Sequence, residues 1–186
     1  MSPEFARGNI CFYNFNNLEE PILKQILDWR NNARIRIMMN NTETIALQNH
    51  LDFVKKLKDN KHSTYWLVSR KNKSCGVVYL HSNTDEPCLA EWGYYLAPNF
   101  LGTGIGFEVG FEAIHIFFKN LGITTLTGFV KQTNFENKRI QEALGFKEDS
   151  STENLISFKL RADSYKVLPQ DFLTFQKIVF YGRTTL

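Results

Sequence analysis

Apolar and polar residues follow two different spacings along this chain, and each spacing predicts one kind of element. Apolar residues three and four positions apart, such as Ile22 and Ile26, indicate amphipathic helices. This spacing predicts one helix over Leu18–Arg30 and a second over Thr44–Asn60. A long apolar stretch over 104–121 predicts a third helix.

Short runs rich in β-branched and aromatic residues predict strands between these helices. They are Ile10–Phe15, Thr64–Arg70, Ser74–Leu80, Leu89–Leu96, Thr124–Lys131 and Leu155–Leu160. Asn134 is a suitable N-cap for a fourth helix, and Gly145 suits the left-handed position after it. The resulting order, β–α–α–β–β–β–α–β–α–β, predicts a mixed α/β fold, a central sheet with helices on both faces.

The third predicted helix carries a single polar stripe on an otherwise apolar cylinder. Glu108, Glu112, His115 and Lys119 follow one another at spacings of four, three and four residues. Side chains at this spacing share one helix face. We therefore expect this stripe, including His115, to be solvated surface.

The length of 186 residues is appropriate for one domain with a full core. We predict that this domain spans residues 10–162. Residues 1–9 are interpreted as an expression-vector remnant outside the fold, because they open Met-Ser-Pro-Glu-Phe. Residues 163–186 form a C-terminal extension that we expect to pack on the domain; a packing helix, a dimer arm and a lid all remain open.

Composition argues against several classes of partner. A net charge of +3 is too small and too dispersed for a nucleic-acid-binding protein, and no apolar run reaches the length of a membrane span. Three widely spaced cysteines indicate reduced thiols and a cytoplasmic location. The four histidines fall on separate predicted elements, so no metal site is expected.

Candidate chemistry is concentrated at residues 101–106, between an aromatic strand and the long helix. The run Leu101-Gly102-Thr103-Gly104-Ile105-Gly106 can bring backbone N–H groups around a ligand, at the positive end of a helix dipole. Such a turn suits phosphate oxygens. The spacing does not fit a Walker loop, which needs a Lys after Gly106, and Phe107 and Val109 break the dinucleotide fingerprint.

This turn resembles the pyrophosphate-binding turn of the GCN5-related N-acetyltransferases (GNAT), which bind acetyl-coenzyme A (acetyl-CoA). A second motif of that family is matched about thirty residues later, where Asn134 opens a helix that ends in Leu144-Gly145-Phe146. The resemblance covers roughly residues 10–162 and implies the GNAT fold, with a mostly antiparallel mixed sheet. Leu101 departs from the Arg or Gln that the family usually has at the start of the turn.

The resemblance also implies roles for individual residues. Backbone groups of Leu101, Gly102, Thr103, Gly104, Ile105 and Gly106 would hold the pyrophosphate, Asn134 and Asn137 would contact the pantetheine, and Lys138 would reach the phosphates. A backbone N–H of Tyr95 or Leu96 would polarise the thioester carbonyl. Glu91 lies where relatives often place the carboxylate that deprotonates the amine.

The acid that protonates the departing thiolate is the uncertain part of this assignment. Many relatives use a Tyr seven residues after Asn134, where this chain has Gln141. An amide can donate a hydrogen bond but cannot deliver a proton. Either Tyr94 or Tyr95 replaces the missing Tyr, or the thiolate leaves unaided. Along a strand, Tyr95 shares a face with Glu91, and Tyr94 lies on the opposite face.

Two further residues extend the apolar faces of the first two helices. Arg30 follows Ile26 by four positions, and His50 follows Leu47 by three. A buried Arg needs an anionic partner or ligand. The pair is either a satisfied part of the core or the lining of an acceptor cleft.

A closer resemblance supports the cleft. Trp29-Arg30-Asn31 and the pattern starting at His50 are similar to the UDP-4-amino-sugar N-acetyltransferases of pseudaminic acid biosynthesis. That resemblance implies a bacterial enzyme, with Arg30, His50, His81 and Tyr95 binding a UDP-linked amino-dideoxy sugar. His81-Ser82 departs from the Thr-Lys of those relatives, which leaves the exact sugar open.

Two alternatives to this acceptor remain. The ribosomal-protein N-terminal acetyltransferases of the same superfamily share Trp29-Arg30-Asn31 and the pattern Glu91-Trp92-Gly93-Tyr94, and would take a protein α-amine. The departures at Leu101 and Gln141 also allow a non-catalytic module that binds acyl-coenzyme A. Homodimerisation is compatible with each of these alternatives.

Overall fold

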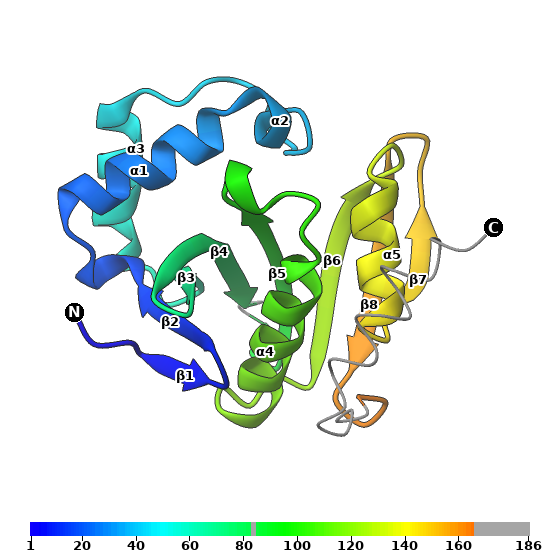
Figure 1. Ribbon diagram of the computed structural model, residues 1–186. Helices are drawn as coiled ribbons and strands as arrows, with labels where there is room; N and C mark the ends of the chain where they lie inside the picture. The colour runs from blue at the N-terminus through cyan, green and yellow to red at the C-terminus, as the bar shows by residue number, and fades with distance from the viewer. Residues whose placement is uncertain (83–84, 166–186) are drawn as a thin grey trace.

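The computed structural model describes residues 1–82 and 85–165, which form one mixed sheet covered by helices on both faces (Figure 1). The eight strands lie in the order β1-β2-β3-β4-β5-β6-β8-β7, and only β5 and β6 pair in parallel. Their bounds are β1 Phe5–Arg7, β2 Ile10–Asn14, β3 Ser63–Arg70, β4 Lys73–Ser82, β5 Leu89–Leu96, β6 Thr125–Lys131, β7 Lys147–Ser151 and β8 Leu155–Arg161. This architecture confirms the predicted fold class.

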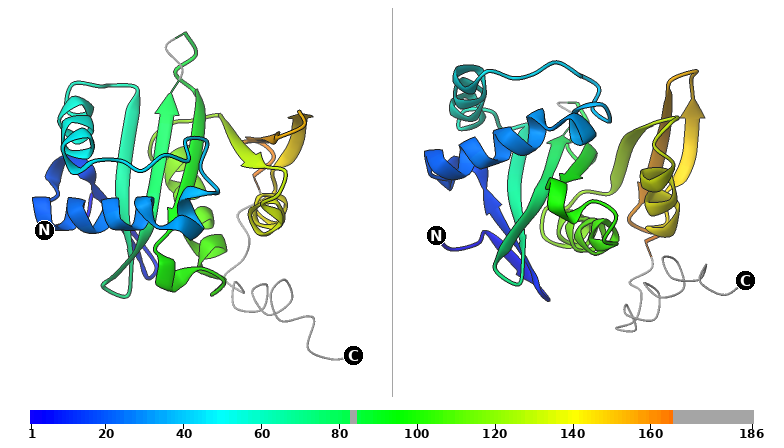
Figure 2. Two further views of the ribbon diagram at one scale, coloured as in Figure 1. Left: turned by 90° about the horizontal axis from the view of Figure 1, so that it is seen from above. Right: turned by 45° about the horizontal axis from the view of Figure 1, so that its top comes forward.

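The helices form two layers. They are α1 Glu20–Asn31, α2 Ala33–Arg36, α3 Leu47–Leu57, α4 Ile105–Lys119 and α5 Phe135–Ala143, with 3₁₀ turns at Phe15–Asn17 and Pro98–Phe100. Figures 1 and 2 show α1 and α3 on one face of β2–β5, and α4 on the other. Each face has its own core. Ile26 and Val54 pack on Leu67 and Val77 under α1 and α3, whereas the α4 side is centred on Trp66, Trp92 and Phe117.

The sheet opens between β5 and β6. Their parallel pairing covers only Leu89–Glu91 against Thr125–Thr127, although β5 continues to Leu96 and β6 to Lys131. Beyond Glu91, β6 pairs only with β8, and Figure 1 shows the two central strands diverging. Since a strand edge without a neighbour leaves backbone N–H and C=O groups free, this opening is where a ligand can meet the backbone.

The predicted polar stripe of α4 is wrong in part. Glu108 is only 8% exposed, and its Oε2 accepts a hydrogen bond of 2.7 Å from Nε of Arg70 on β3. Glu112 forms an ion pair with Arg7 on β1. His115 is partly buried rather than solvated. The spacing placed these side chains on one helix face correctly, but arginines from strands distant in sequence cover that face.

Three elements escaped the sequence prediction. β1 lies within residues 1–9, so excluding that segment from the fold is wrong for Phe5–Arg7, which pair with Ile10–Phe12. β7 carries the exposed sequence Lys-Glu-Asp-Ser-Ser, which has no apolar alternation to mark a strand. α2 is a single turn between α1 and α3. The second predicted helix is also shorter than expected, since α3 covers only Leu47–Leu57 of the predicted Thr44–Asn60.

Most of the predicted C-terminal extension lies outside the described residues. Of the part that is described, Tyr165 packs its ring against Phe118 on α4, at 5.3 Å between centroids. None of the helices in the described part of the chain combines the length and apolar character that a bilayer crossing needs.

Candidate active site

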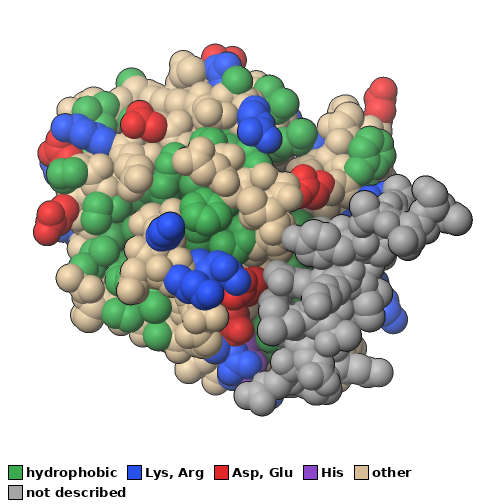
Figure 3. All heavy atoms as spheres, viewed as in Figure 1, with side chains coloured by type: hydrophobic (Ala, Val, Ile, Leu, Met, Phe, Trp, Pro, Cys, Tyr) green, Lys and Arg blue, Asp and Glu red, His purple; other side chains and the backbone are tan. Residues whose placement is uncertain are grey.

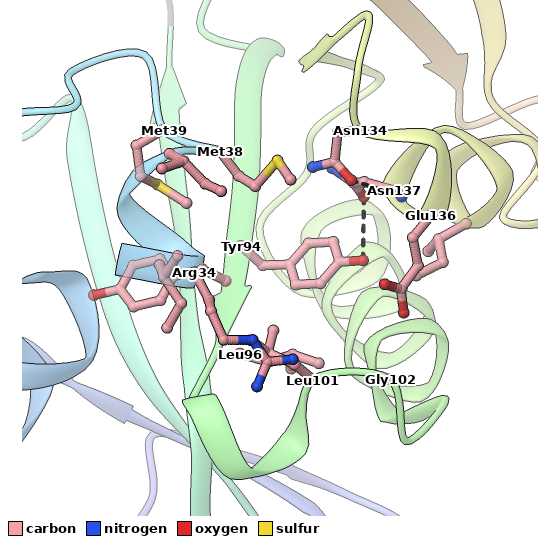
Figure 4. A pocket seen from close by; sticks show the side chains of 14 residues that line it. Arg34, Met38, Met39, Tyr94, Leu96, Leu101, Gly102, Asn134, Glu136 and Asn137 are labelled. Atoms are coloured by element: carbon pink, nitrogen blue, oxygen red, sulfur yellow. Dashed lines mark hydrogen bonds between the residues drawn. The ribbon is translucent and has the colours of Figure 1, made fainter. Parts of the chain in front are cut away.

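A cavity of about 350 Å³ lies where α2, the end of β5, the glycine turn and α5 meet (Figure 4). Its lining residues are Arg34, Ile35, Ile37, Met38, Met39, Tyr94, Tyr95, Leu96, Leu101, Gly102, Asn134, Glu136, Asn137 and Ile140. In the space-filling view of this side of the molecule, apolar side chains gather below α2, with Lys and Arg side chains beside them (Figure 3). The wall is therefore mainly apolar, with a small number of polar groups, as is typical of ligand sites.

The glycine turn has the backbone geometry that its sequence predicts. Gly102 and Gly104 have positive φ angles of 73° and 79°, in the left-handed region that glycine tolerates best. Thr103 closes the turn, because its Oγ1 donates a hydrogen bond of 2.7 Å to the carbonyl of Phe100. α4 starts at Ile105, so the free N–H groups of its first turn lie beside the cavity.

Side chains contribute little positive charge to this turn. Leu101 lines the cavity without a charge, and Ile105 is buried in the α4 core. Arg34 lines the same cavity from α2, and Figure 4 shows its side chain directed toward Leu96 and Leu101. No salt bridge of Arg34 is found among the described residues. The positive charge on this side of the cavity therefore comes from the backbone N–H groups of the turn and from one arginine on another element.

Strand pairing selects between the two backbone N–H groups predicted to polarise a carbonyl. Ala97 N donates to Cys75 O at 2.8 Å, so Ala97 and Tyr95 direct their N–H groups toward β4. Leu96 lies between them and directs its N–H group away from β4, into the opening beside β6. Leu96 is therefore the geometrically suitable donor, and Tyr95 is not.

Glu91 lies opposite His81 in the β4–β5 ladder and Thr127 in the β5–β6 ladder, at the last paired position before the sheet opens. Partial burial raises the pKa of the Glu91 carboxyl above its usual range. Tyr79 occupies the space above Gly93, next to Glu91 along the strand, since a Cβ on Gly93 would clash with the Tyr79 hydroxyl. Glu91 does not line the cavity of Figure 4 and lies on the α1–α3 face of the sheet.

Both ring nitrogens of His81 are occupied by neighbours. Nδ1 lies 2.9 Å from Ser63 Oγ, and Nε2 lies 3.2 Å from Tyr65 Oη. Burial lowers the pKa of His81 and raises that of Tyr65 to about 12. The imidazole is thus held neutral and fixed on the sheet face shared with Glu91.

Arg30 and His50 lie on the helical layer outside the cavity lining. Arg30 Nη2 donates a hydrogen bond of 2.6 Å to the carbonyl of Asn41, while its Nη1 has no hydrogen-bond partner among the described residues. Burial lowers the pKa of Arg30, partly offset by Tyr95. His50 is 6% exposed, burial lowers its pKa, and its Nε2 is also unpartnered in the described part of the chain.

The start of α5 brings the second motif to the cavity. Asn134 Oδ1 accepts a hydrogen bond of 3.1 Å from Asn137 N, which is the expected N-cap. Asn137 Oδ1 in turn accepts a hydrogen bond of 3.2 Å from the Tyr94 hydroxyl, which is the dashed line in Figure 4. Lys138 lies on α5 outside the lining, and Gln141 is 3% exposed in the interior.

Sequence reasoning missed the lining contributed by α2 and the segment after it. Ile37, Met38 and Met39 form one wall of the cavity, and Ile37 is 56% exposed. Nζ of Lys131 on β6 donates a hydrogen bond of 2.9 Å to the carbonyl of Ile37. This bond connects the wall to the strand on the other side of the opening. The apolar run from Ile35 to Met39 was the available signal, but no periodicity placed it.

Comparison with known proteins identifies the family to which this chain belongs. Residues 15–147 match the family model of the acetyltransferase (GNAT) domain. The chain belongs to the GNAT acetyltransferase family. The fold and the enzyme class that the two sequence motifs predicted are thus both confirmed.

Two curated relatives of this GNAT protein are acetyltransferases PseH from two strains of Campylobacter jejuni. They are 29% and 27% identical over 156 and 157 residues, which is 84% of this chain and 96% of each relative.

Solved structures share the fold. C. jejuni N-acetyltransferase PseH in complex with acetyl coenzyme A matches with a TM-score of 0.68 at 24% identity, over 82% of this chain and 99% of that one. Spermidine N-acetyltransferase from Vibrio cholerae, in complex with CoA and spermine, matches with a TM-score of 0.77 at 17% identity, over 86% and 99%. In the described part of this GNAT chain, no three His, Cys, Asp or Glu side chains gather as a metal site.

Proposed function

We propose that this protein transfers the acetyl group of acetyl-CoA to the amine of a nucleotide-linked amino-dideoxy sugar of the UDP-4-amino type. The observation that carries the proposal is the opening between β5 and β6, which leaves the Leu96 N–H free beside the glycine turn. A thioester carbonyl and a pyrophosphate need these two groups of donors at the two ends of one extended ligand.

In this proposal the coenzyme enters between α4 and α5. The pyrophosphate lies on the N–H groups from Leu101 to Gly106, the pantetheine passes Asn134 and Asn137, and Lys138 reaches a phosphate. The acetyl group then lies at the end of β5, where the Leu96 N–H donates to its oxygen. The hydrogen bond from this N–H becomes stronger as negative charge develops on that oxygen.

The acceptor approaches from the α1–α3 face of the sheet. Its amine nitrogen attacks the thioester carbon, forming a C–N bond, and the C–S bond then breaks with its electron pair leaving on sulfur. The ammonium proton passes to the Glu91 carboxylate, directly or through water. A carboxyl whose pKa is raised by burial is a stronger base than a surface carboxylate, which suits this step.

Unsatisfied guanidinium groups favour an anionic acceptor. Arg30 Nη1 and Arg36 Nε are buried without hydrogen-bond partners among the described residues, and the two side chains interact electrostatically. Two neighbouring cations without a carboxylate are costly unless an anion binds between them. A nucleotide diphosphate would satisfy both, with His50, His81 and Tyr95 contacting the rest of the acceptor. The likeness to PseH in the curated relatives supports the same class.

A protein α-amine is the second candidate acceptor. Glu91 lies on the face from which the acceptor approaches, and a carboxylate there favours a cationic peptide terminus. The first experiment is mass spectrometry of a UDP-linked 4-amino-dideoxy sugar, and separately of an α-amino peptide, each with acetyl-CoA and the protein. An acetyl mass gain on the sugar alone supports the proposal. A gain on the peptide alone replaces the acceptor, and coenzyme binding without any transfer supports a non-catalytic module.

A further inference from the structure

The leaving thiolate needs a hydrogen-bond donor that the sequence does not supply at the usual place. Gln141 occupies that position, but it is 3% exposed, does not line the cavity, and its Oε1 has no partner in the described part of the chain. Its amide is therefore a poor candidate for contact with a sulfur atom in the cavity. A side-chain donor to this sulfur must line the cavity on the coenzyme side of β5.

Tyr94 is such a side chain. It lines the cavity from the face of β5 that meets α4 and α5, and its ring stacks on Trp92 at 5.6 Å between centroids. The absence of a side chain at Gly106 makes room for it, because a Cβ there would lie 3.2 Å from the Tyr94 hydroxyl. The Tyr94 hydroxyl donates to Asn137 Oδ1, 43 residues away in sequence. The phenol is thus held by three elements.

β5 separates the two halves of the reaction. Glu91 and Tyr95 face the α1–α3 layer, from which the acceptor approaches, whereas Tyr94 faces the α4–α5 layer, along which the coenzyme lies in the proposed function. A nucleophile entering from one face and a sulfur leaving toward the other suit the tetrahedral carbon of acyl transfer. The residue on the leaving-group side is Tyr94, and Tyr95 is on the other side.

We propose that Tyr94, positioned by Asn137, donates a hydrogen bond to the sulfur of coenzyme A as the C–S bond breaks. This inference rests on the proposed function, because it needs the coenzyme in this cavity. It assigns Tyr94 as a catalytic residue and Asn137 as a positioning residue, in place of the tyrosine that Gln141 lacks.

The amide of Asn137 suits both stages of this step. In the free protein its Oδ1 accepts a hydrogen bond from the Tyr94 hydroxyl. When the hydroxyl turns to the sulfur, rotation of the amide presents Nδ2 to the Tyr94 oxygen. The phenol then accepts a hydrogen bond from Asn137 while it donates one to the sulfur. Burial raises the pKa of Tyr94 above its usual range, so it stays neutral and acts as a hydrogen-bond donor. The thiolate leaves with the C–S electron pair and is protonated by solvent.

The test measures ionisation of the coenzyme thiol on the protein, without any acceptor. Coenzyme A bound to wild type, Tyr94→Phe, Asn137→Leu and Tyr95→Phe is titrated by the ultraviolet absorbance of its thiolate. The same titration with desulfo-coenzyme A gives the protein signal to be subtracted. Arg34 and Glu136 also line the cavity and are present in all four proteins. Differences between variants therefore report the Tyr94 hydroxyl.

We expect the bound thiol to ionise about tenfold less readily in Tyr94→Phe than in wild type, because a hydrogen bond to a charged group is lost. Asn137→Leu should show a smaller loss, since Tyr94 keeps its hydroxyl but loses the amide that positions it. Tyr95→Phe should leave thiol ionisation at the wild-type value. With an established acceptor, turnover of Tyr94→Phe should fall about tenfold, with little change in affinity for acetyl-CoA.

Equal thiol ionisation in wild type and Tyr94→Phe, with coenzyme A bound to both, would overturn this inference and leave the proposed function intact. No binding of coenzyme A by the wild-type protein would overturn both. If Tyr94→Phe does not fold, Asn137→Leu decides: a wild-type value of thiol ionisation there contradicts the inference. Loss in Tyr94→Phe alone would retain the donor and remove Asn137 from its positioning role.

Discussion

Alternation along β5 decides which layer each of its side chains can contact. Glu91 and Tyr95 face the α1–α3 layer, and Trp92 and Tyr94 face α4 and α5, as the period of two requires. The strand was short and regular enough for this to be predicted. The environment of each side chain follows from the layer it meets, and so do its pKa and its chemistry.

Glu91→Gln should lower turnover about a hundredfold, a magnitude typical of removing a general base. Because burial raises the pKa of Glu91, wild-type turnover should fall on acidification at a higher pH than a surface carboxyl would cause. The pH dependence of kcat checks this. The exposed Glu148→Gln on β7 is the control and should match wild type. Unchanged kcat in Glu91→Gln would remove Glu91 from the mechanism.

The same variant should be more stable than wild type at neutral pH. A raised folded-state pKa means that folding favours the protonated carboxyl, so the charged form destabilises the fold above that pKa. The advantage of Glu91→Gln should shrink as pH falls through the raised pKa of the folded protein and should be gone below the pKa of the carboxyl in the unfolded chain. Denaturant unfolding at neutral and acid pH measures it. A variant less stable than wild type at neutral pH would show that the carboxylate holds a structural partner.

Arg30→Ala should raise the KM for an anionic acceptor about tenfold and leave the KM for acetyl-CoA near its wild-type value. The reason is the loss of a half-buried guanidinium whose Nη1 has no partner in the described residues. Steady-state kinetics with each substrate varied in turn checks the split. Lys24→Ala, exposed on the same helix, is the matched control. An unchanged acceptor KM would mean that Arg30 does not bind the acceptor and only holds the Asn41 carbonyl.

At the scale of elements, the turn before α4 shows how local sequence can specify a binding surface. Positive φ angles at Gly102 and Gly104 turn the chain sharply from β5 into the helix, and the helix N-terminus supplies both free N–H groups and dipole. All of this depends on residues close in sequence. The conformation of the glycine turn was therefore predictable without knowledge of the tertiary structure.

Gly102→Ala should weaken acetyl-CoA binding about tenfold, because a methyl group would enter the turn on which the pyrophosphate lies in the proposed function. Gly122→Ala is a closely matched control. The two glycines have φ angles of 73° and 70°, and a Cβ at either would have no atom within 4 Å. Both variants should lose about 1–2 kcal/mol of stability from left-handed strain. Calorimetric titration and thermal unfolding separate the two effects; equal coenzyme affinity would remove Gly102 from the site.

At the scale of the whole molecule, the N-terminal segment completes the edge of the sheet far from the cavity. Glu4 Oε2 accepts a hydrogen bond of 2.9 Å from Nε1 of Trp66, which is 2% exposed, and Arg7 pairs with Glu112. Figure 1 shows β1 at the opposite side of the sheet from β6 and α5. This segment should therefore affect stability without affecting chemistry.

Deleting residues 1–7 should destabilise the fold by about 1–3 kcal/mol, because the buried Trp66 N–H loses its acceptor. For a chain of this size each kcal/mol lowers Tm by about 2–4 °C. Turnover measured well below Tm should stay at the wild-type value. Glu4→Gln, which keeps an acceptor oxygen, is the milder comparison. A deletion variant with wild-type Tm would show that these contacts contribute nothing to stability.

The sequence by itself determined the features that depend on neighbouring residues. The helical and strand periods, the glycine turn, the Asn134 N-cap and the division of β5 into two faces all arise from local spacing. Together with the two motifs they were sufficient for the fold class and the enzyme family. β7 was missed because its charged sequence has no period, and its pairing with β8 is made by the backbone.

Only the tertiary structure decided which of these features meet. The hydrogen bond from Tyr94 to Asn137, the burial of Glu108 by Arg70, and the α2 wall of the cavity join residues far apart in the chain. The free N–H of Leu96 depends on where pairing between β5 and β6 stops. No local pattern records such a stop, because it depends on pairing between two strands that are far apart in the sequence.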